Sequence, residues 1–278
     1  MNKTQLYAMA SNIRYSHKIK NKLDSEYHSH KDFKIHFILS GDIHFFIEKK
    51  VYRLQHGDLI VINNNEFHKY TVHSGTQYEQ VSIGFDPALA RFFSTPDCDL
   101  LKCFTGRPKG EKNRVHLSPK QIGEIQDILN RFESIPAKAE AEAPVLKLSC
   151  LLELLVFVNR AFSTAESVEE QATLPEKLQP ILSYIENNLD GDLSLEALGR
   201  RFFISSSYLS FLFKEETGVN INEYIIFKRI ARAKELLSQN YSVTEACHMS
   251  GFNDYSNFIR RFKKIVGVSP GQYKKMDM

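Results

Sequence analysis

The last third of the chain carries one short pattern twice, at a fixed offset of 49 residues. The matching residues are Glu196 and Ala197 with Glu245 and Ala246, Phe203 with Phe252, Ser207 with Ser256, Phe213 and Lys214 with Phe262 and Lys263, and Gly218 with Gly267. A constant offset without gaps predicts two copies of one small helical unit, held a fixed distance apart. Since few ligands other than a nucleic acid duplex present a surface that repeats in this way, double-stranded DNA is the first partner to expect.

Each copy has the pattern of a helix, a tight turn and a second helix. In the second copy, Ser242 and Glu245 match a capping box, Gly251 ends the short helix that follows, and Asp254 caps the next helix. Helical spacing buries the large apolar residues of both second helices and leaves their other face to solvent. The outward residues, which we expect to contact DNA, are Ser206, Ser207, Ser210, Phe211 and Lys214 in the first copy and Tyr255, Ser256, Asn257, Arg260, Arg261 and Lys263 in the second.

Residues 221–239 connect the two copies and show the apolar spacing of a helix. At 1.5 Å per residue such a helix spans roughly 25 to 30 Å, close to the about 34 Å of one helical repeat of B-DNA. A rigid spacer of this length would place both second helices in successive major grooves on one face of the duplex. It carries four cations that we expect to contact phosphates, namely Lys228, Arg229, Arg232 and Lys234.

Five spaced motifs lie in residues 193–275: L-S-L-E-A-L at 193–198, S-S-Y-L-S-F-L-F-K-E-E-T-G at 206–218, R-A-K-E-L-L at 232–237, G-F-N-D-Y-S-N-F-I-R-R-F-K-K at 251–264 and V-S-P-G-Q-Y-K at 268–274. Together they resemble the DNA-binding domain of the AraC/XylS transcription regulators. The resemblance implies that the outward positions of both second helices read base pairs and that RNA polymerase is a partner. One position departs from the family, because Phe211 stands where an arginine is common. A phenylalanine cannot make bidentate contacts to guanine but can pack on a thymine methyl.

The front of the chain is strand-like from about residue 26 to residue 86. Aromatic and β-branched residues gather in four stretches separated by turn residues, at 33–40, 43–54, 57–63 and 78–85, which predicts a small sandwich or barrel. It contains Y-H-S-H-K-D-F-K-I-H-F-I-L-S-G at 27–41 and Y-R-L-Q-H-G-D-L-I-V-I-N-N-N-E-F-H at 52–68. These segments resemble the cupin barrel that serves as the sensor in many of these regulators.

The candidate ligand residues of this barrel are His28, His30, Lys34, His68 and Tyr78. On a strand His28, His30 and Lys34 share one face. In metal-binding cupins a glutamate occupies the position of Lys34, whose ammonium has no lone pair to donate, so we expect no metal and no cofactor. The resemblance instead implies a small-molecule effector, a sugar or related metabolite, in an interior suited to hydroxyls or a carboxylate. The alternative is a cupin metalloenzyme whose helical tail is a docking module.

Two helices are expected after the barrel, over 118–132 and 145–162. The second is apolar over most of its circumference, more than one neighbour would bury. In the resembled family such helices pair the protomers, so we expect a homodimer; the alternative is packing on its own barrel. The predicted fold class is α+β. It comprises a cupin-like ligand-sensing β-barrel (1–110), a helical dimerisation segment (111–165), a linker (166–177), and an all-α domain of two helix-turn-helix units joined by a linker helix (178–278).

The composition supports this division, because 278 residues with 42% apolar content suit two compact domains. The net charge of +3 is small for a nucleic-acid-binding chain, so the placement of charge matters more than its total. No apolar run reaches a membrane span, and residues 1–22 lack the apolar core of an export signal. We therefore expect a cytoplasmic, ligand-responsive transcription regulator with reduced cysteines, and not an enzyme.

Overall fold

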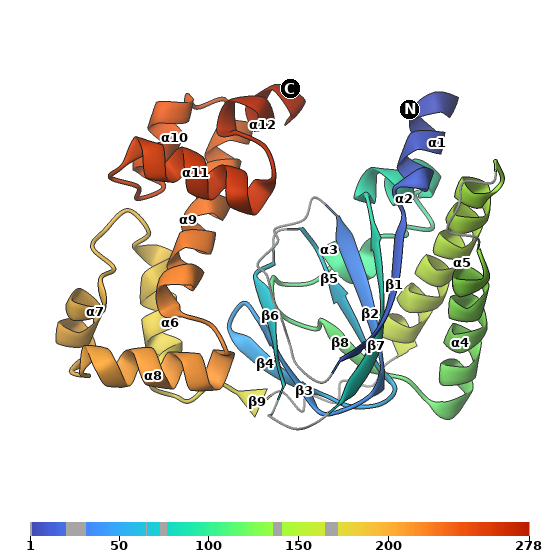
Figure 1. The fold of residues 1–278 in the computed structure, drawn as a ribbon, viewed down its shortest axis with the longest axis horizontal. Helices are drawn as coiled ribbons and strands as arrows, with labels where there is room; N and C mark the ends of the chain where they lie inside the picture. The colour runs from blue at the N-terminus through green and yellow to red at the C-terminus, as the bar shows by residue number, and fades with distance from the viewer. Residues whose placement is uncertain are drawn as a thin grey trace.

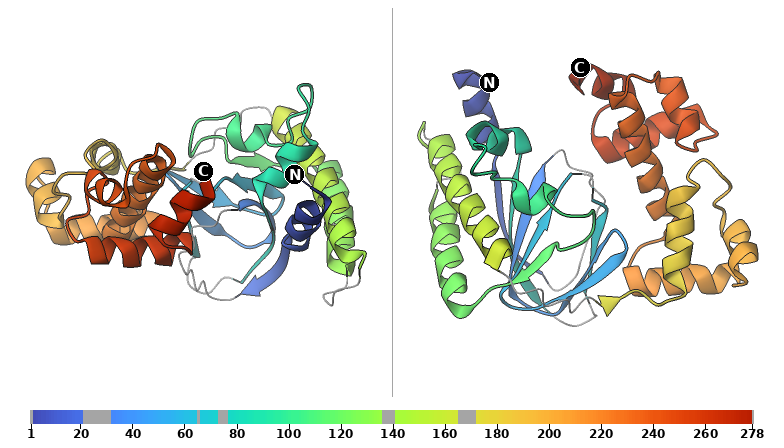
Figure 2. Two further views of the ribbon diagram at one scale, coloured as in Figure 1. Left: turned by 90° about the horizontal axis from the view of Figure 1, so that it is seen from above. Right: turned by 180° about the vertical axis from the view of Figure 1, so that it is seen from behind.

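The computed structural model describes residues 2–20, 32–64, 66–72, 77–135, 141–164 and 172–277. The prediction of a mixed α and β region followed by a helical region is confirmed. Figures 1 and 2 show the layers: a pair of helices covers one sheet, a second sheet faces the first, and the C-terminal helices pack on the outer side of the second sheet.

Two antiparallel sheets form the centre of the N-terminal part. The five-stranded sheet has the order β1 (Arg14–Lys20), β7 (Tyr78–Phe85), β2 (Phe33–Ser40), β5 (Asp58–Ile62) and β8 (Arg114–His116), and the four-stranded sheet has the order β6 (His68–Val72), β3 (Ile43–Ile47), β4 (Lys50–Leu54) and β9 (Ala172–Thr173). Among the described residues no ladder of hydrogen bonds joins one sheet to the other. The predicted cupin-like β-barrel is therefore not closed, and we refer to this part as the N-terminal sandwich.

The strands agree with the sequence pattern at the centre of the sheet and differ at its edges. The predicted strands at 33–40 and 78–85 are confirmed as β2 and β7. The stretch expected as one strand at 43–54 is a hairpin, because the chain turns at Glu48 and Lys49 with Glu48 in the left-handed region at φ 56°. Ala172–Thr173, expected within the linker, pair with β4 as β9.

The space between the sheets is filled by alternate residues of their strands. Ile38, Ile60 and Tyr78 enter it from the five-stranded sheet and Phe45 and Tyr52 from the four-stranded sheet, each at most 2% exposed. On β2 the even-numbered residues face this inter-sheet core, whereas the odd-numbered ones belong to a second core on the sheet's other side. This is the alternation that a period of two predicts.

That second core joins the five-stranded sheet to its covering helices, which are α1 (Lys3–Ser11), α2 (Pro87–Phe93), α3 (Lys102–Thr105), α4 (Pro119–Ser134) and α5 (Ala143–Thr164). The predicted helices at 118–132 and 145–162 correspond to α4 and α5. Most of the apolar circumference of α5 is buried within this chain, since Leu151, Leu154, Leu155 and Val158 are fully buried. Packing on its own chain thus accounts for much of the apolar excess that suggested a homodimer.

The C-terminal helices form two further cores. They are α6 (Leu178–Asn187), α7 (Leu195–Phe202), α8 (Ser206–Thr217), α9 (Ile221–Ser238), α10 (Val243–Met249), α11 (Tyr255–Val266) and α12 (Pro270–Asp277). We call α7 and α8 the first unit and α10 and α11 the second unit. The first core combines α6, α7, α8 and the start of α9 with residues of the four-stranded sheet, and the second combines the end of α9 with α10, α11 and α12.

The two units do not repeat with one offset, which corrects the sequence analysis. Their first helices begin after the caps Ser194 and Ser242, 48 positions apart, whereas their second helices begin after Ser205 and Asp254, 49 positions apart. The turn of the second unit is one residue longer. The proposed match of Phe203 with Phe252 is therefore wrong: Phe203 is 97% exposed and Phe252 is 4% exposed.

The residue that fits Phe203 by position is Gly251. Both follow the first helix of their unit and both are left-handed, at φ 55° and 87°. Glycine adopts this conformation freely, whereas a bulky side chain is strained there. A Cβ atom on Gly251 would collide with the carbonyl oxygen of Leu189, so the second unit requires glycine where the first tolerates phenylalanine.

None of the helices in the described part of the chain is long and apolar enough to cross a membrane.

Candidate functional sites

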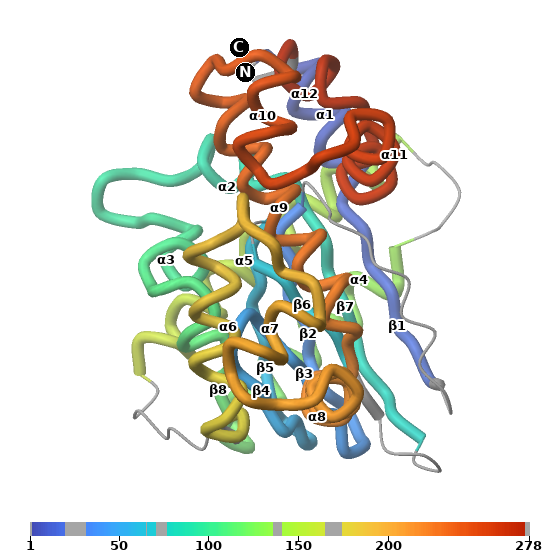
Figure 3. The backbone as a smooth tube through the Cα atoms, turned by 90° about the vertical axis from the view of Figure 1, so that its left-hand side faces the viewer, coloured from blue at the N-terminus to red at the C-terminus, as the bar shows by residue number. Residues whose placement is uncertain are grey.

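The second helices of the two units, α8 and α11, lie across opposite ends of α9. Figure 1 shows both of them on the side facing the viewer, and in Figure 3 both are seen nearly end-on, so they run in similar directions on one side of α9. The 18 residues of α9 correspond to about 27 Å.

The outward face of α8 is mostly uncharged. Ser207, Phe211 and Lys214 are exposed, with Phe211 at 62%, while Ser206 and Ser210 are half-buried. The helix begins where the hydroxyl of its cap Ser205 accepts the Tyr208 N–H at 3.2 Å, and ends at the left-handed Gly218. The face offers hydroxyls, one aromatic ring and one ammonium group.

The outward face of α11 is basic. Tyr255, Ser256, Arg260 and Lys263 are exposed, and the cap Asp254 accepts the Asn257 N–H at 2.9 Å. The guanidinium of Arg260 donates to the side-chain carbonyl of Asn257 at 3.0 Å, which orients both groups on the same face. Arg261 lies at the edge and is half-buried, and its Nε has no hydrogen-bond partner among the described residues.

We expected the cations of α9 to contact phosphates. For Lys228 and Arg229 this is wrong, because both bind partners inside the protein. Lys228 is 7% exposed and pairs with Glu48 and Glu186. Arg229 donates to the carbonyl oxygens of Leu189 and Gly191, each at 2.9 Å. The other two also have partners within the chain, because Arg232 pairs with Glu235 and the Lys234 ammonium lies 5.9 Å from the centre of the Tyr273 ring.

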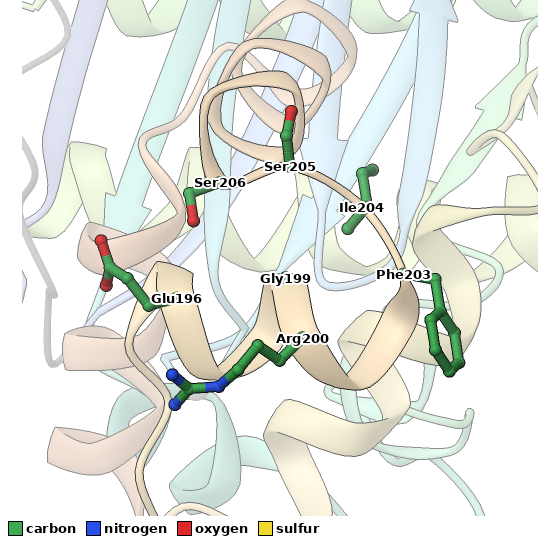
Figure 4. A pocket seen from close by; sticks show the side chains of 7 residues that line it. All are labelled: Glu196, Gly199, Arg200, Phe203, Ile204, Ser205 and Ser206. Atoms are coloured by element: carbon green, nitrogen blue, oxygen red, sulfur yellow. The ribbon is translucent and has the colours of Figure 1, made fainter.

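A pocket of about 520 Å³ lies at the turn of the first unit (Figure 4). Glu196, Arg200 and Phe203 line one part of it, and Ser205 and Ser206 line the part formed by the start of α8. It belongs to the surface beside the outward face of α8 and shares no residue with the inter-sheet core.

Three of the five predicted ligand residues lie within the described ranges, and His28 and His30 lie outside them. Tyr78 belongs to the inter-sheet core and is 1% exposed. His68 contacts Phe45 edge to face, with ring centres 5.8 Å apart, and its Nδ1–H donates to the Glu66 carbonyl at 2.9 Å. The Nε2 of His68 therefore keeps its lone pair.

The positive charge of Lys34 influences the protonation of His68. Burial, with a smaller contribution from the positive charge of Arg14, lowers the pKa of Lys34 to about 8. Burial followed by the charge of Lys34 lowers the pKa of His68 to about 4. At neutral pH the pair consists of a largely protonated ammonium and a neutral imidazole, which suits a ligand with an anionic group and a hydroxyl.

The inter-sheet core contains polar residues that the sequence analysis did not single out. His36 Nδ1 lies 2.8 Å from the Ser82 hydroxyl, and the Tyr70 hydroxyl lies 2.9 Å from the same ring. The Oε1 atom of Gln80 is buried and accepts no hydrogen bond from the described residues. Strand alternation could have predicted this set. His36, Tyr70 and Gln80 each lie two positions along the same strand from one of the predicted ligand residues Lys34, His68 and Tyr78.

Within the described ranges no group of three His, Cys, Asp or Glu side chains is placed to hold a metal ion.

Two protein families match the chain. Residues 12–155 match the AraC-like ligand binding domain, and residues 198–276 match a helix-turn-helix domain. The first match alone spans more than half of the chain.

Curated relatives of the chain are named as regulators. An uncharacterized HTH-type transcriptional regulator of Staphylococcus aureus is 23% identical over 252 residues, which are 86% of this chain and 31% of the relative. The regulatory protein PocR of Salmonella typhimurium is 29% identical over 162 residues, 54% of either chain. The chain thus spans about a third to a half of the length of these relatives, which are named as regulators rather than enzymes. The structure of ToxT from Vibrio cholerae is 16% identical over 96% of this chain and 98% of that chain, with a TM-score of 0.38.

Proposed function

Because the chain belongs to the AraC family of transcription regulators, we propose that it binds a specific DNA site through both helix-turn-helix units and changes its DNA affinity when a small molecule enters the N-terminal sandwich. A protein that binds chromosomal DNA would work in the cytoplasm. The observation that carries the proposal is the placement of α8 and α11 on one side of α9, with both outward faces accessible.

The two units would contribute differently to the choice of DNA site. Arg260, oriented by Asn257, has the donors for bidentate contact with a guanine. In the first unit Phe211 would pack on a thymine methyl, and the serines of α8 would contact base edges or phosphates. Lys214 and Lys263 are exposed at matching positions of the two helices and would neutralise phosphates.

The inter-sheet core is the proposed effector site. Lys34 supplies a positive charge, His68 Nε2 and the Gln80 side-chain oxygen supply acceptors, and Tyr70 and Tyr78 supply hydroxyls beside apolar walls. Such a set fits a small polyhydroxylated molecule or hydroxy acid, and a sugar or related metabolite remains our proposal. His28 and His30 belong to the same proposal by their position in the sequence.

Homodimerisation and contact with RNA polymerase complete the proposal. The apolar residues of α5 that stay exposed are Val145 at 60% and Leu146 at 47%, near its first turn. They would be the centre of an interface between two protomers. Sedimentation of the full chain at micromolar concentration tests this, and monomer alone would contradict it.

DNA binding is tested by selecting sites from a random oligonucleotide pool with the full chain and measuring affinity by fluorescence anisotropy across a salt series. The proposal expects a selected sequence that binds at least about 10³-fold tighter than random DNA, and an affinity that falls steeply with salt because counterions are released. A panel of sugars and hydroxy acids added to the same assay should contain a compound that shifts the affinity. Equal affinity for selected and random DNA would contradict the proposal.

A further inference from the structure

One face of the four-stranded sheet packs in the inter-sheet core, and its other face packs on the C-terminal helices. On β3, Phe45 points into the inter-sheet core and stacks on Tyr70 with ring centres 4.1 Å apart. Its neighbour Phe46 points out and meets Phe213 of α8 at 6.4 Å. Adjacent residues of one strand therefore contact the proposed effector site and the DNA-reading helix of the first unit.

The outer side of this sheet packs tightly on the first unit and the start of α9. Phe67, just before β6, lies edge to face with Tyr224 at 5.3 Å and with Phe227 at 4.7 Å. Phe46, Phe67 and Val51 belong to the same buried core as the residues of α6, α8 and α9. By contrast, the core of the second unit contains no residue of the sandwich.

A buried cluster of charges lies at the centre of this contact. The Lys228 ammonium on α9 pairs with Glu48, at the β3–β4 turn, and with Glu186 on α6 at 2.6 Å. Lys49, also at the turn, pairs with Glu186 at 2.5 Å. Glu48 is 3% exposed, and its carboxylate also accepts the Phe67 N–H at 2.8 Å and pairs with Lys109 at 3.3 Å.

Lys228 and Glu186 stay charged despite their burial. Burial alone would lower the pKa of Lys228, but the carboxylates of Glu48 and Glu186 raise it. Burial alone would raise the pKa of Glu186, but Lys228 and Lys49 lower it. Charges buried in this way are favourable only while every partner is in place, so loss of one partner leaves the others unpaired and strongly disfavours the docked arrangement.

We infer that the four-stranded sheet transmits the state of the sandwich interior to the first unit, and that the cluster of Glu48, Lys228 and Glu186 is the latch that keeps this unit docked. A ligand that displaces Phe45, or Tyr70 stacked on it, shifts β3, the strand that carries Phe46 and leads into the turn at Glu48. Within the described ranges, the core of the second unit includes no residue of the sandwich, so this unit follows through α9. The regulatory part of this inference rests on the proposed function, whereas the docking itself does not.

Hydrogen–deuterium exchange of the full chain, followed by mass spectrometry, tests the latch. Lys228→Met should speed exchange about tenfold or more both in residues 43–54 of the sandwich and in residues 178–187 of α6, because the two surfaces separate together. Lys234→Met removes a charge from the same helix at the contact with Tyr273 and should leave residues 43–54 unchanged. Residues 43–54 exchanging as in the wild type in Lys228→Met would overturn the latch.

Glu48→Gln keeps the size of the side chain and is a second variant for the same exchange experiment if Lys228→Met does not fold. It should speed exchange in residues 178–187, on the other side of the contact. Faster exchange confined to residues 43–54 would show a purely local role and overturn the inference.

The coupling through the sheet is tested by a matched pair of core variants. Phe45→Leu alters the inter-sheet core, and Phe37→Leu alters an equally buried residue of β2 on the helix-covered side. Only Phe45→Leu should change exchange in α6 and the start of α9. Equal changes in both variants would indicate general destabilisation and overturn the coupling. These readouts need no DNA, so a chain that shows the paired exchange and binds no DNA would refute the proposed function and leave the latch standing.

Discussion

The first helix-turn-helix unit packs on the sandwich and presents a mostly uncharged face, whereas the second has a core of its own and presents a basic face. Their second helices nevertheless lie on one side of α9 in similar directions. The unit that packs on the sandwich thus has fewer groups with the donors for a guanine contact, whereas the unit with Arg260 shares no core residue with the described part of the sandwich. Under the proposed function, we expect the first unit to receive the signal and the second to supply most of the sequence specificity.

The largest expected effect is on the free energy of unfolding, and it distinguishes the core of the first unit from the core of the second. Phe213→Ala and Phe262→Ala remove equally buried rings from matching positions, and each should lower the free energy of unfolding by about 3 to 5 kcal/mol. Phe213 contacts Phe46 of the sandwich, whereas the described core around Phe262 includes no sandwich residue. In urea unfolding followed by hydrogen exchange, Phe213→Ala should therefore also expose residues 43–54, and Phe262→Ala should not. Exposure of that hairpin in both variants would contradict the separation.

The two turns should respond to substitution in opposite directions. Gly251→Ala places a Cβ against the Leu189 carbonyl in a left-handed residue and should destabilise by about 1 to 3 kcal/mol. Phe203→Gly relieves a strained, exposed residue and should stabilise by about 0.5 to 1 kcal/mol. Thermal unfolding of both variants measures this, and a loss of stability in Phe203→Gly would show that its ring has a structural partner.

DNA affinity should depend more on the second unit than on the first. Arg260→Ala should cost about 1 to 3 kcal/mol on the selected site and relax specificity at one base pair, because the bidentate donors are lost. Phe211→Ala should cost less and act at a thymine. Lys263→Ala should weaken binding to selected and random DNA alike. Competition anisotropy with single base-pair substitutions distinguishes these patterns, and equal losses on both DNAs for Arg260→Ala would refute direct readout.

A smaller expected effect is that the stability contributed by the ion pairs of Glu186 and Lys228 changes with pH. The pKa of Glu186 is lowered from its ordinary value of 4.5, so its ion pairs contribute stability that is present above pH 4.5 and lost as the pH falls through the lowered value. The pKa of Lys228 is raised from 10.5, so its contribution is present below pH 10.5 and lost as the pH rises through the raised value. The stability difference between the wild type and Lys228→Met should therefore shrink below pH 4.5. A difference that stays constant in acid would contradict this.

The sequence predicted features set by local chemistry and missed those set by distant partners. The caps Ser242 and Asp254, the spacer helix and the central strands follow from capping patterns and periodicity, and the structure confirms them. The pairing of Lys228 with Glu48 joins residues 180 positions apart, and no local pattern distinguishes such a lysine from one that faces DNA.

The prediction of one 49-residue offset for the whole repeat was wrong because the match of Glu196 and Ala197 with Glu245 and Ala246 is a coincidence of residue type. The helix caps show the shorter spacing. The ligand candidates Lys34, His68 and Tyr78 came from the cupin resemblance, and their relative positions depend on how two sheets face each other, which strand alternation does not specify.

Hydroxyl-radical footprinting of the full chain on its selected DNA tests the central claim most directly. If both units enter successive major grooves of one duplex, the cleavage pattern will show two protected patches on one face of the DNA, about 10 to 10.5 base pairs apart. Arg260→Ala should weaken protection at one patch first. A single patch, or two patches on opposite faces of the helix, would contradict the account.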